Sequence, residues 1–173
     1  SRTLVLLDGI PQNDPFGVQH NRFVYSLVVQ QKLSEQLQYI LVHNLGVEDG
    51  TAADHTQAQW YGINQYLLYA LTPTLSAGAR VEWLRDRDGV RVAGPGNIPG
   101  VHAWNGHSFP GDFFEMTYGL NWRPRPNIML RPEIRYDWYH GRLGVVNGEP
   151  GLPFNDDRSS TQLTVATDLT ILF

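Results

Sequence analysis

The stretch RPEIRYDWYHG, residues 131–141, alternates between charged residues and apolar or aromatic residues. One parity carries four charges, at Arg131, Glu133, Arg135 and Asp137. The other parity carries Pro132, Ile134, Tyr136 and Trp138. Because successive side chains of a β-strand point to opposite faces, the stretch predicts a strand with one charged face and one apolar face.

The same period of two recurs from about residue 22 to the last residue, whereas helical periodicity is hard to find. It predicts seven strands, at residues 22–33, 37–48, 57–71, 75–84, 112–123, 128–139 and 161–173. Between them, very short connections alternate with long ones. The short ones are residues 34–36, 72–74 and 124–127, and the long ones are residues 49–56, 85–111 and 139–160.

Tight turns at one end and long loops at the other are typical of a transmembrane barrel. A charge in lipid costs about 2 to 4 kcal/mol near the midplane, so the apolar parity would face lipid and the charged parity a watery lumen. Aromatic residues near strand ends, such as Trp83 and Trp122, are typical of interfacial girdles. The sequence therefore predicts an all-β, antiparallel transmembrane β-barrel, of which these strands form part.

A soluble β-sandwich or a lipocalin-like barrel is the alternative, because its strands alternate in the same way. In that fold the apolar residues would pack inward and the charged residues would form the solvated exterior. Periodicity alone does not say which face is which.

Charges on neighbouring predicted strands favour a cross-strand network on the lumen side. The residues expected to form it are Arg80, Glu82, Glu115, Arg131, Glu133, Arg135 and Asp137. Pro132 interrupts this pattern, since proline cannot donate a ladder hydrogen bond, and we expect a bulge or a local distortion there.

Composition limits the partners. The chain has 173 residues, with 13 basic against 17 acidic residues and a net charge of −4, and it has no basic run suited to nucleic acid. It has no cysteine, which excludes disulfides and thiol chemistry. The sequence contains no run of about eighteen apolar residues, the length that would predict a membrane-spanning helix.

Enzymatic interpretations have little support. His102 and His107 with Asp112 could ligate a metal, but loop histidines are usually unliganded. A catalytic triad could be assembled only on paper from Ser159, Ser160, His140 and Asp156, because no nucleophile motif accompanies them. Glu133 with Asp137 or Glu115 could form a carboxylate pair for glycoside chemistry, but the interleaved arginines would hold these carboxylates ionised. We therefore expect a protein that is not an enzyme, with no catalytic residues, metal or cofactor.

Two resemblances support a membrane barrel. The terminal QLTVATDLTILF resembles the last strand of bacterial outer-membrane barrels, which implies that Phe173 is an assembly signal read by the barrel assembly machinery. Segments such as WYGINQY and LRPEIRYDW resemble the putative beta-barrel porin-2, OmpL-like family over about residues 19–173. The family implies a channel-like barrel in the lipid of the bacterial outer membrane, and it supplies no catalytic residues.

The first residues resemble a different family. SRTLVLLDGIPQNDPFG, residues 1–17, is similar to the plug of TonB-dependent receptors, in which a strand, here Leu4 to Leu7, is followed by a proline-rich turn. By composition alone the segment could also be an ordinary strand followed by a Gly/Pro turn. The matching positions are Asp8, Gly9, Pro11, Asn13, Asp14, Pro15 and Gly17. We therefore expect a plug-like segment at residues 1–17 and the C-terminal part of a barrel at residues 18–173. Because single-chain barrels have even strand counts, seven strands also suggest residues missing near Gly17 and Val18, or closure with other chains.

Three functions follow as hypotheses. The first is a porin-like channel that passes small hydrophilic solutes through a charged lumen. The second is a TonB-dependent receptor with a plug that imports a scarce ligand. The third is a barrel that conducts nothing and anchors an envelope complex.

Overall fold

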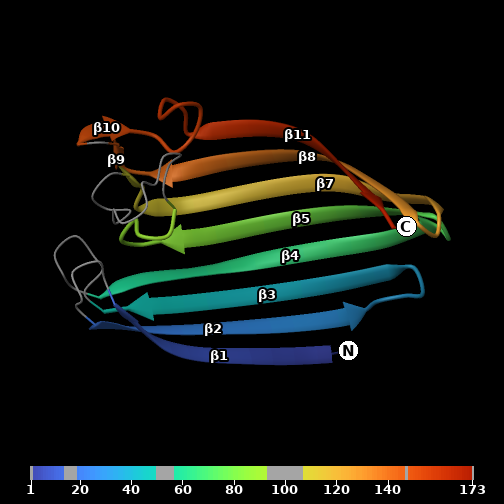
Figure 1. Ribbon diagram of the computed structural model, residues 1–173, viewed down its shortest axis with the longest axis horizontal. Helices are drawn as coiled ribbons and strands as arrows, with labels where there is room; N and C mark the ends of the chain where they lie inside the picture. The colour runs from blue at the N-terminus through green and yellow to red at the C-terminus, as the bar shows by residue number, and fades with distance from the viewer. Residues whose placement is uncertain (1, 14–18, 50–56, 93–106, 147, 173) are drawn as a thin grey trace.

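The computed structural model describes residues 2–13, 19–49, 57–92, 107–146 and 148–172. Eight long strands form one antiparallel sheet in the order β1-β2-β3-β4-β5-β7-β8-β11 (Figure 1). Their bounds are β1 Arg2–Asn13, β2 Gln19–Lys32, β3 Leu37–Glu48, β4 Ala58–Thr72, β5 Leu75–Asp86, β7 Gly111–Arg125, β8 Ile128–Gly141 and β11 Thr161–Ile171. A small sheet is formed by β6 (His107–Ser108), β9 (Gly144–Val146) and β10 (Glu149–Gly151). Among the described residues no helix is long and apolar enough to cross a membrane.

The connections follow the predicted alternation. The short turns between β2 and β3, β4 and β5, and β7 and β8 lie at the end of the sheet where both termini are found (Figure 1). We call this the turn end. We call the opposite end of the sheet, where β9 and β10 lie, the loop end (Figure 1). All seven predicted strands are present, and most of their bounds agree within three residues.

The prediction of seven strands was wrong by one, because β1 is an eighth strand of the same sheet. It pairs with β2 along its whole length, from Arg2 opposite Gln30 to Asn13 opposite Gln19. The plug interpretation of residues 1–17 is therefore not supported, since most of that segment is a strand of the sheet. An even strand count answers one argument for missing residues near Gly17 and Val18, but that junction lies outside the described residues, so the suggestion stays a prediction.

The two faces of the sheet reverse the arrangement of a soluble protein. We call the face that carries Arg80 and Glu115 the inner face and the opposite one the outer face. Leu163 and Val165 on the outer face are 64% and 75% exposed, whereas Glu115 and Asp137 on the inner face are 6% and 4% exposed. Large exposed apolar surfaces mark contact with a partner or with a membrane. This distribution argues against the soluble sandwich, which would bury its apolar residues.

Pro132 lies at an interruption of the pairing between β7 and β8, as the sequence predicted. Among the described pairs of β7 and β8, Gly119–Glu133 is followed directly by Trp122–Leu130, so pairing with β7 is interrupted beside Pro132. The register is the same on both sides, which means that Pro132 causes a local distortion and not a bulge. On its other side Pro132 keeps its place opposite Thr167 of β11.

Candidate functional site: a ladder of charges on the inner face

The strand register places the predicted charges in adjacent rows across four strands. One row consists of Arg80, Thr117, Arg135 and Thr164, contributed by β5, β7, β8 and β11. The next row towards the loop end consists of Glu82, Glu115, Asp137 and Gln162. Basic groups of one row therefore lie diagonally opposite acidic groups of the next, within reach of long side chains.

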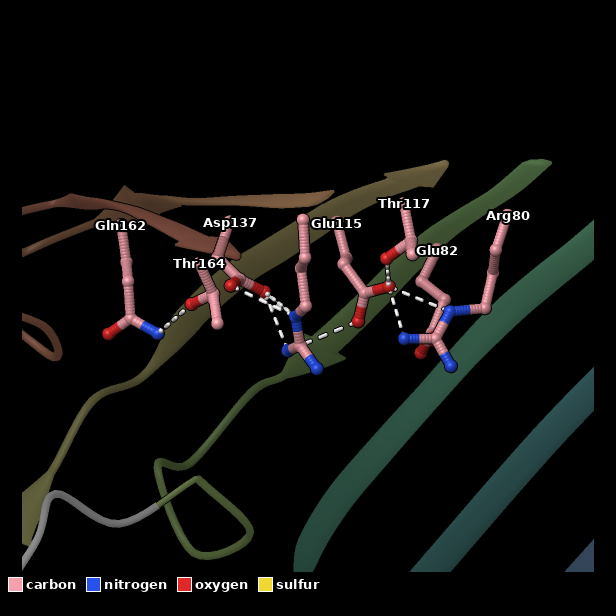
Figure 2. Close-up of polar contacts among 8 residues, drawn as sticks. Arg80, Glu82, Glu115, Thr117, Asp137, Gln162 and Thr164 are labelled. Carbon is pink, nitrogen blue, oxygen red and sulfur yellow. Dashed lines mark hydrogen bonds and ion pairs between the residues drawn. The ribbon is translucent and has the colours of Figure 1, made fainter. Parts of the chain in front are cut away.

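Glu115 joins two arginines. Arg80 donates from Nε to Oε1 of Glu115 at 2.7 Å and also contacts Glu82 at 3.0 Å. Arg135 contacts Oε2 of Glu115 at 3.1 Å and Oδ1 of Asp137 at 2.6 Å. Figure 2 shows the labelled side chains projecting from one side of the sheet, with Glu115 between the strands that supply its partners.

The carboxylates of this group lie deeper than the arginines. The side chains of Glu115 and Asp137 are 8% and 5% exposed, compared with 29% for Arg80 and 40% for Arg135. Thr117 donates a further hydrogen bond to Glu115. Buried carboxylates need such partners, because an unpaired buried charge is costly. The arrangement leaves the side chains of both arginines partly exposed.

The remaining predicted residues lie towards the turn end. Arg131 forms an ion pair with Asp168 of β11, a residue that sequence reasoning did not select. Glu133 lies on the same face but takes part in none of the ion pairs found among the described residues. We use the name charge ladder for Arg80, Glu82, Glu115, Arg131, Glu133, Arg135, Asp137 and Asp168.

Four residues of the plug motif lie in a strand that carries no member of the charge ladder. Asp8, Gly9, Pro11 and Asn13 all lie in β1. Asp14, Pro15, Gly17 and Phe173 lie outside the described residues, as do His102 and Ser1. No described group of three or more His, Cys, Asp or Glu side chains is arranged to hold a metal ion.

A second polar cluster, which sequence reasoning missed, lies at the loop end of the inner face. The fully buried Asp86 accepts backbone N–H bonds from Val90, Arg91 and Val92 at 3.1, 2.7 and 2.9 Å. These bonds fix the chain after β5 so that the Arg91 guanidinium lies 4.5 Å from the ring centre of Trp60. Burial, followed by the nearby positive charge of Arg22, lowers the pKa of Arg91.

Arg22 completes this cluster from β2. Its Nε lies 2.7 Å from Oε2 of Glu48, and its guanidinium lies 6.0 Å from the ring centre of Trp60. Trp60 lies over Gly46, where an added Cβ would come within 2.1 Å of the indole ring. The glycine is therefore required for the aromatic ring to lie against the sheet. The run RDRDG at residues 85–89 could have indicated this cluster, because a strand that ends in Asp and Gly predicts a turn capped by a side chain.

The outer face carries an aromatic group near the loop end. Phe114 and Trp138 are stacked with ring centres 5.2 Å apart, and Tyr61 meets Trp83 edge to face at 5.6 Å. The Trp83 indole donates to Asp112 at 3.0 Å, and Asp112 also pairs with Arg85 at 2.6 Å. Aromatic rings with polar partners at one level are typical of a membrane interface.

Comparison with known proteins gave one result. The family model described as Putative beta-barrel porin-2, OmpL-like, matches residues 3–173. The match includes most of the segment that resembled a plug. Comparisons with curated proteins and with solved structures gave no match.

Proposed function

The chain belongs to the Putative beta-barrel porin-2, OmpL-like family, and we propose that its sheet is a wall of a channel that passes small hydrophilic solutes along the charge ladder. The family places the chain among porin-like barrels of the outer membrane, which are typically non-enzymatic. The chemistry of the inner face therefore concerns passage and selection of solutes.

The observation that carries this proposal is the reversed distribution of polar and apolar groups. Charged side chains of four neighbouring strands gather on the inner face, while the outer face exposes leucine, valine and aromatic side chains. A lipid-facing exterior and a watery interior satisfy both faces at once. A charged inner wall of this kind selects solutes by charge as well as by size.

Closure of the wall is part of the proposal. Among the described residues, the outer edges of β1 and β11 have no strand partner. Unpaired backbone groups at such edges are costly in lipid, so a membrane-spanning sheet has to close into a barrel. We propose that further strands of the same polypeptide, or other copies of the chain, complete the barrel.

Planar-bilayer recording of the purified full-length protein tests the proposal. We expect stepwise conductance increases in potassium chloride, and a reversal potential in a salt gradient that depends on the charge ladder. A folded protein that inserts into bilayers but produces no conductance would contradict the channel and favour a barrel with an anchoring role.

A further inference from the structure

A hollow of about 450 Å³ lies on the inner face beside the charge ladder and extends over β4, β5, β7, β8 and β11. Its floor follows from the register, because one row across the sheet consists of Gly78, Gly119, Glu133 and Ala166. Three of these four positions have a side chain no larger than a methyl group. The row therefore leaves space above the sheet, and Glu133 is its only charged member.

Glu133 has no counter-ion in the described part of the chain. Its cross-strand neighbours, Gly119 and Ala166, have no side-chain donor to offer. The arginines two positions away on the same face of β8 are engaged elsewhere, Arg131 with Asp168 and Arg135 with Glu115 and Asp137. The Glu133 side chain is also exposed, so a mobile ligand can reach it.

The charge ladder as a whole has more negative than positive charges, which also favours binding of a cation. Its three arginines are outnumbered by its five carboxylates, counting the members defined above. Glu82, Glu115, Asp137 and Asp168 each contact at least one arginine. Glu133 is therefore the one ladder carboxylate that contacts no arginine among the described residues, and it stands in a row with room for another group.

Two arginines line the hollow, Arg80 and Arg131, and both are paired with carboxylates. The other walls of the hollow suit an organic cation. Tyr66 lines one side, and its ring already lies 6.0 Å from the Arg80 guanidinium. Asn121 and Thr117 line it with oxygen atoms that can accept hydrogen bonds. Aromatic faces and carboxylates both attract ammonium groups.

We propose that this hollow is a binding subsite for small organic ammonium ions. The ammonium group pairs with Glu133, and the carbon chain lies over Gly78 and Gly119. The inference rests on the proposed function only in that it takes the inner face to be in contact with water.

Butylammonium chloride is the probe that we would use, in two measurements on the full-length protein. Calorimetric titration of the detergent-solubilised protein measures binding without requiring conduction. Bilayer recording measures the concentration of butylammonium that halves the potassium current. Glu133→Gln keeps the size of the side chain and removes its charge. We expect it to raise both the dissociation constant for butylammonium and the half-blocking concentration about threefold or more, which is the effect of losing a partly exposed ion pair.

Two further variants make the result specific. Ala166→Leu fills the hollow without changing its charge, and we expect it to weaken butylammonium binding as well. Glu149→Gln removes a carboxylate from the exposed β10, outside the hollow, and should leave the binding constant unchanged.

The outcomes separate this inference from the proposed function. Equal butylammonium binding by the wild type and Glu133→Gln, or no binding by the wild type, would overturn the subsite even if the protein conducts. Binding that depends on Glu133 in a protein that does not conduct would support the subsite and contradict the channel.

Discussion

Arg135 connects two carboxylates of the charge ladder, because its guanidinium contacts both Glu115 of β7 and Asp137 of its own strand. Both carboxylates are nearly buried, so their charge is balanced mainly by the arginines in contact with them. A single neutral substitution at this position changes the local charge by one unit without changing the apolar face.

We predict that Arg135→Gln makes the channel more selective for cations. The remaining carboxylates attract potassium and repel chloride, so the reversal potential in a potassium chloride gradient should move towards the potassium equilibrium potential. The Arg131→Gln variant should shift it in the same direction. Arg125→Gln, at the turn end of β7, is the matched control for loss of one positive charge. Reversal potentials equal to that of the wild type in both ladder variants would contradict this role.

Asp86 has a structural role at the same scale. Its carboxylate satisfies three backbone N–H groups and has no exposed surface. We predict that Asp86→Ala lowers the free energy of unfolding by about 2 to 4 kcal/mol, since the donors lose a charged acceptor. Urea unfolding followed by tryptophan fluorescence measures this loss. Glu149→Ala, at an exposed position of β10, is the control and should unfold at the same urea concentration as the wild type. If Asp86→Ala also unfolds at the wild-type midpoint, these hydrogen bonds do not stabilise the segment.

At the scale of the element, each long strand presents different chemistry to its two sides. In β7, Leu120 lies on the outer face and the adjacent Asn121 on the inner face. In β11, Val165 and Thr164 stand in the same relation. These neighbouring pairs allow the orientation of the sheet to be tested with the same substitution on either face.

We predict that Leu120→Asp and Val165→Asp prevent assembly in the membrane, whereas Asn121→Asp and Thr164→Asp assemble normally. Placing a charged side chain in lipid costs about 2 to 4 kcal/mol for a basic residue and somewhat less for an acidic one, whereas a charged side chain in a water-filled interior stays hydrated. Heat-modifiable migration of the membrane fraction on gels reports folding. Normal assembly of both outer-face variants would overturn the assignment of the faces.

The strands that could be predicted from sequence are those with one polar and one apolar parity. Strand β1 was not predicted as part of the barrel sheet, because Leu4, Val5, Leu6 and Leu7 are apolar on both parities and give no alternation. The resemblance to a plug predicted a strand at Leu4 to Leu7 but assigned it to the plug. Its assignment required the pairing with β2, which depends on contacts between distant residues.

Parity also showed which charges share a face, but it could not show which of them meet. The partner of Arg131 is Asp168, thirty-seven positions further on, and only the register of β8 with β11 brings them together. The isolation of Glu133 likewise depends on Gly119 and Ala166 being its cross-strand neighbours. Register is set by the packing of whole strands and turns, and for this reason alternation in one strand does not reveal it.

For the whole molecule, the inner face is divided between two kinds of surface. Strands β5, β7, β8 and β11 supply the charge ladder, whereas β1 and β2 mix apolar side chains such as Leu4 and Val28 with polar ones such as Arg2, Ser26 and Gln30 on the same face. A solute that moves along this face therefore meets the charge ladder on one side and a mixed polar and apolar surface on the other. The account as a whole depends on the inner face being in water and the outer face in lipid.

Cysteine accessibility along β11 tests that claim most directly, because the natural sequence has no cysteine. Single cysteines at Leu163, Thr164, Val165 and Ala166 would be exposed to a membrane-impermeant maleimide in protein reconstituted into liposomes and permeabilised on both sides. We predict fast labelling at 164 and 166 and little labelling at 163 and 165, since only the first pair belongs to the inner face. Equal labelling at all four positions, or the opposite alternation, would contradict the account.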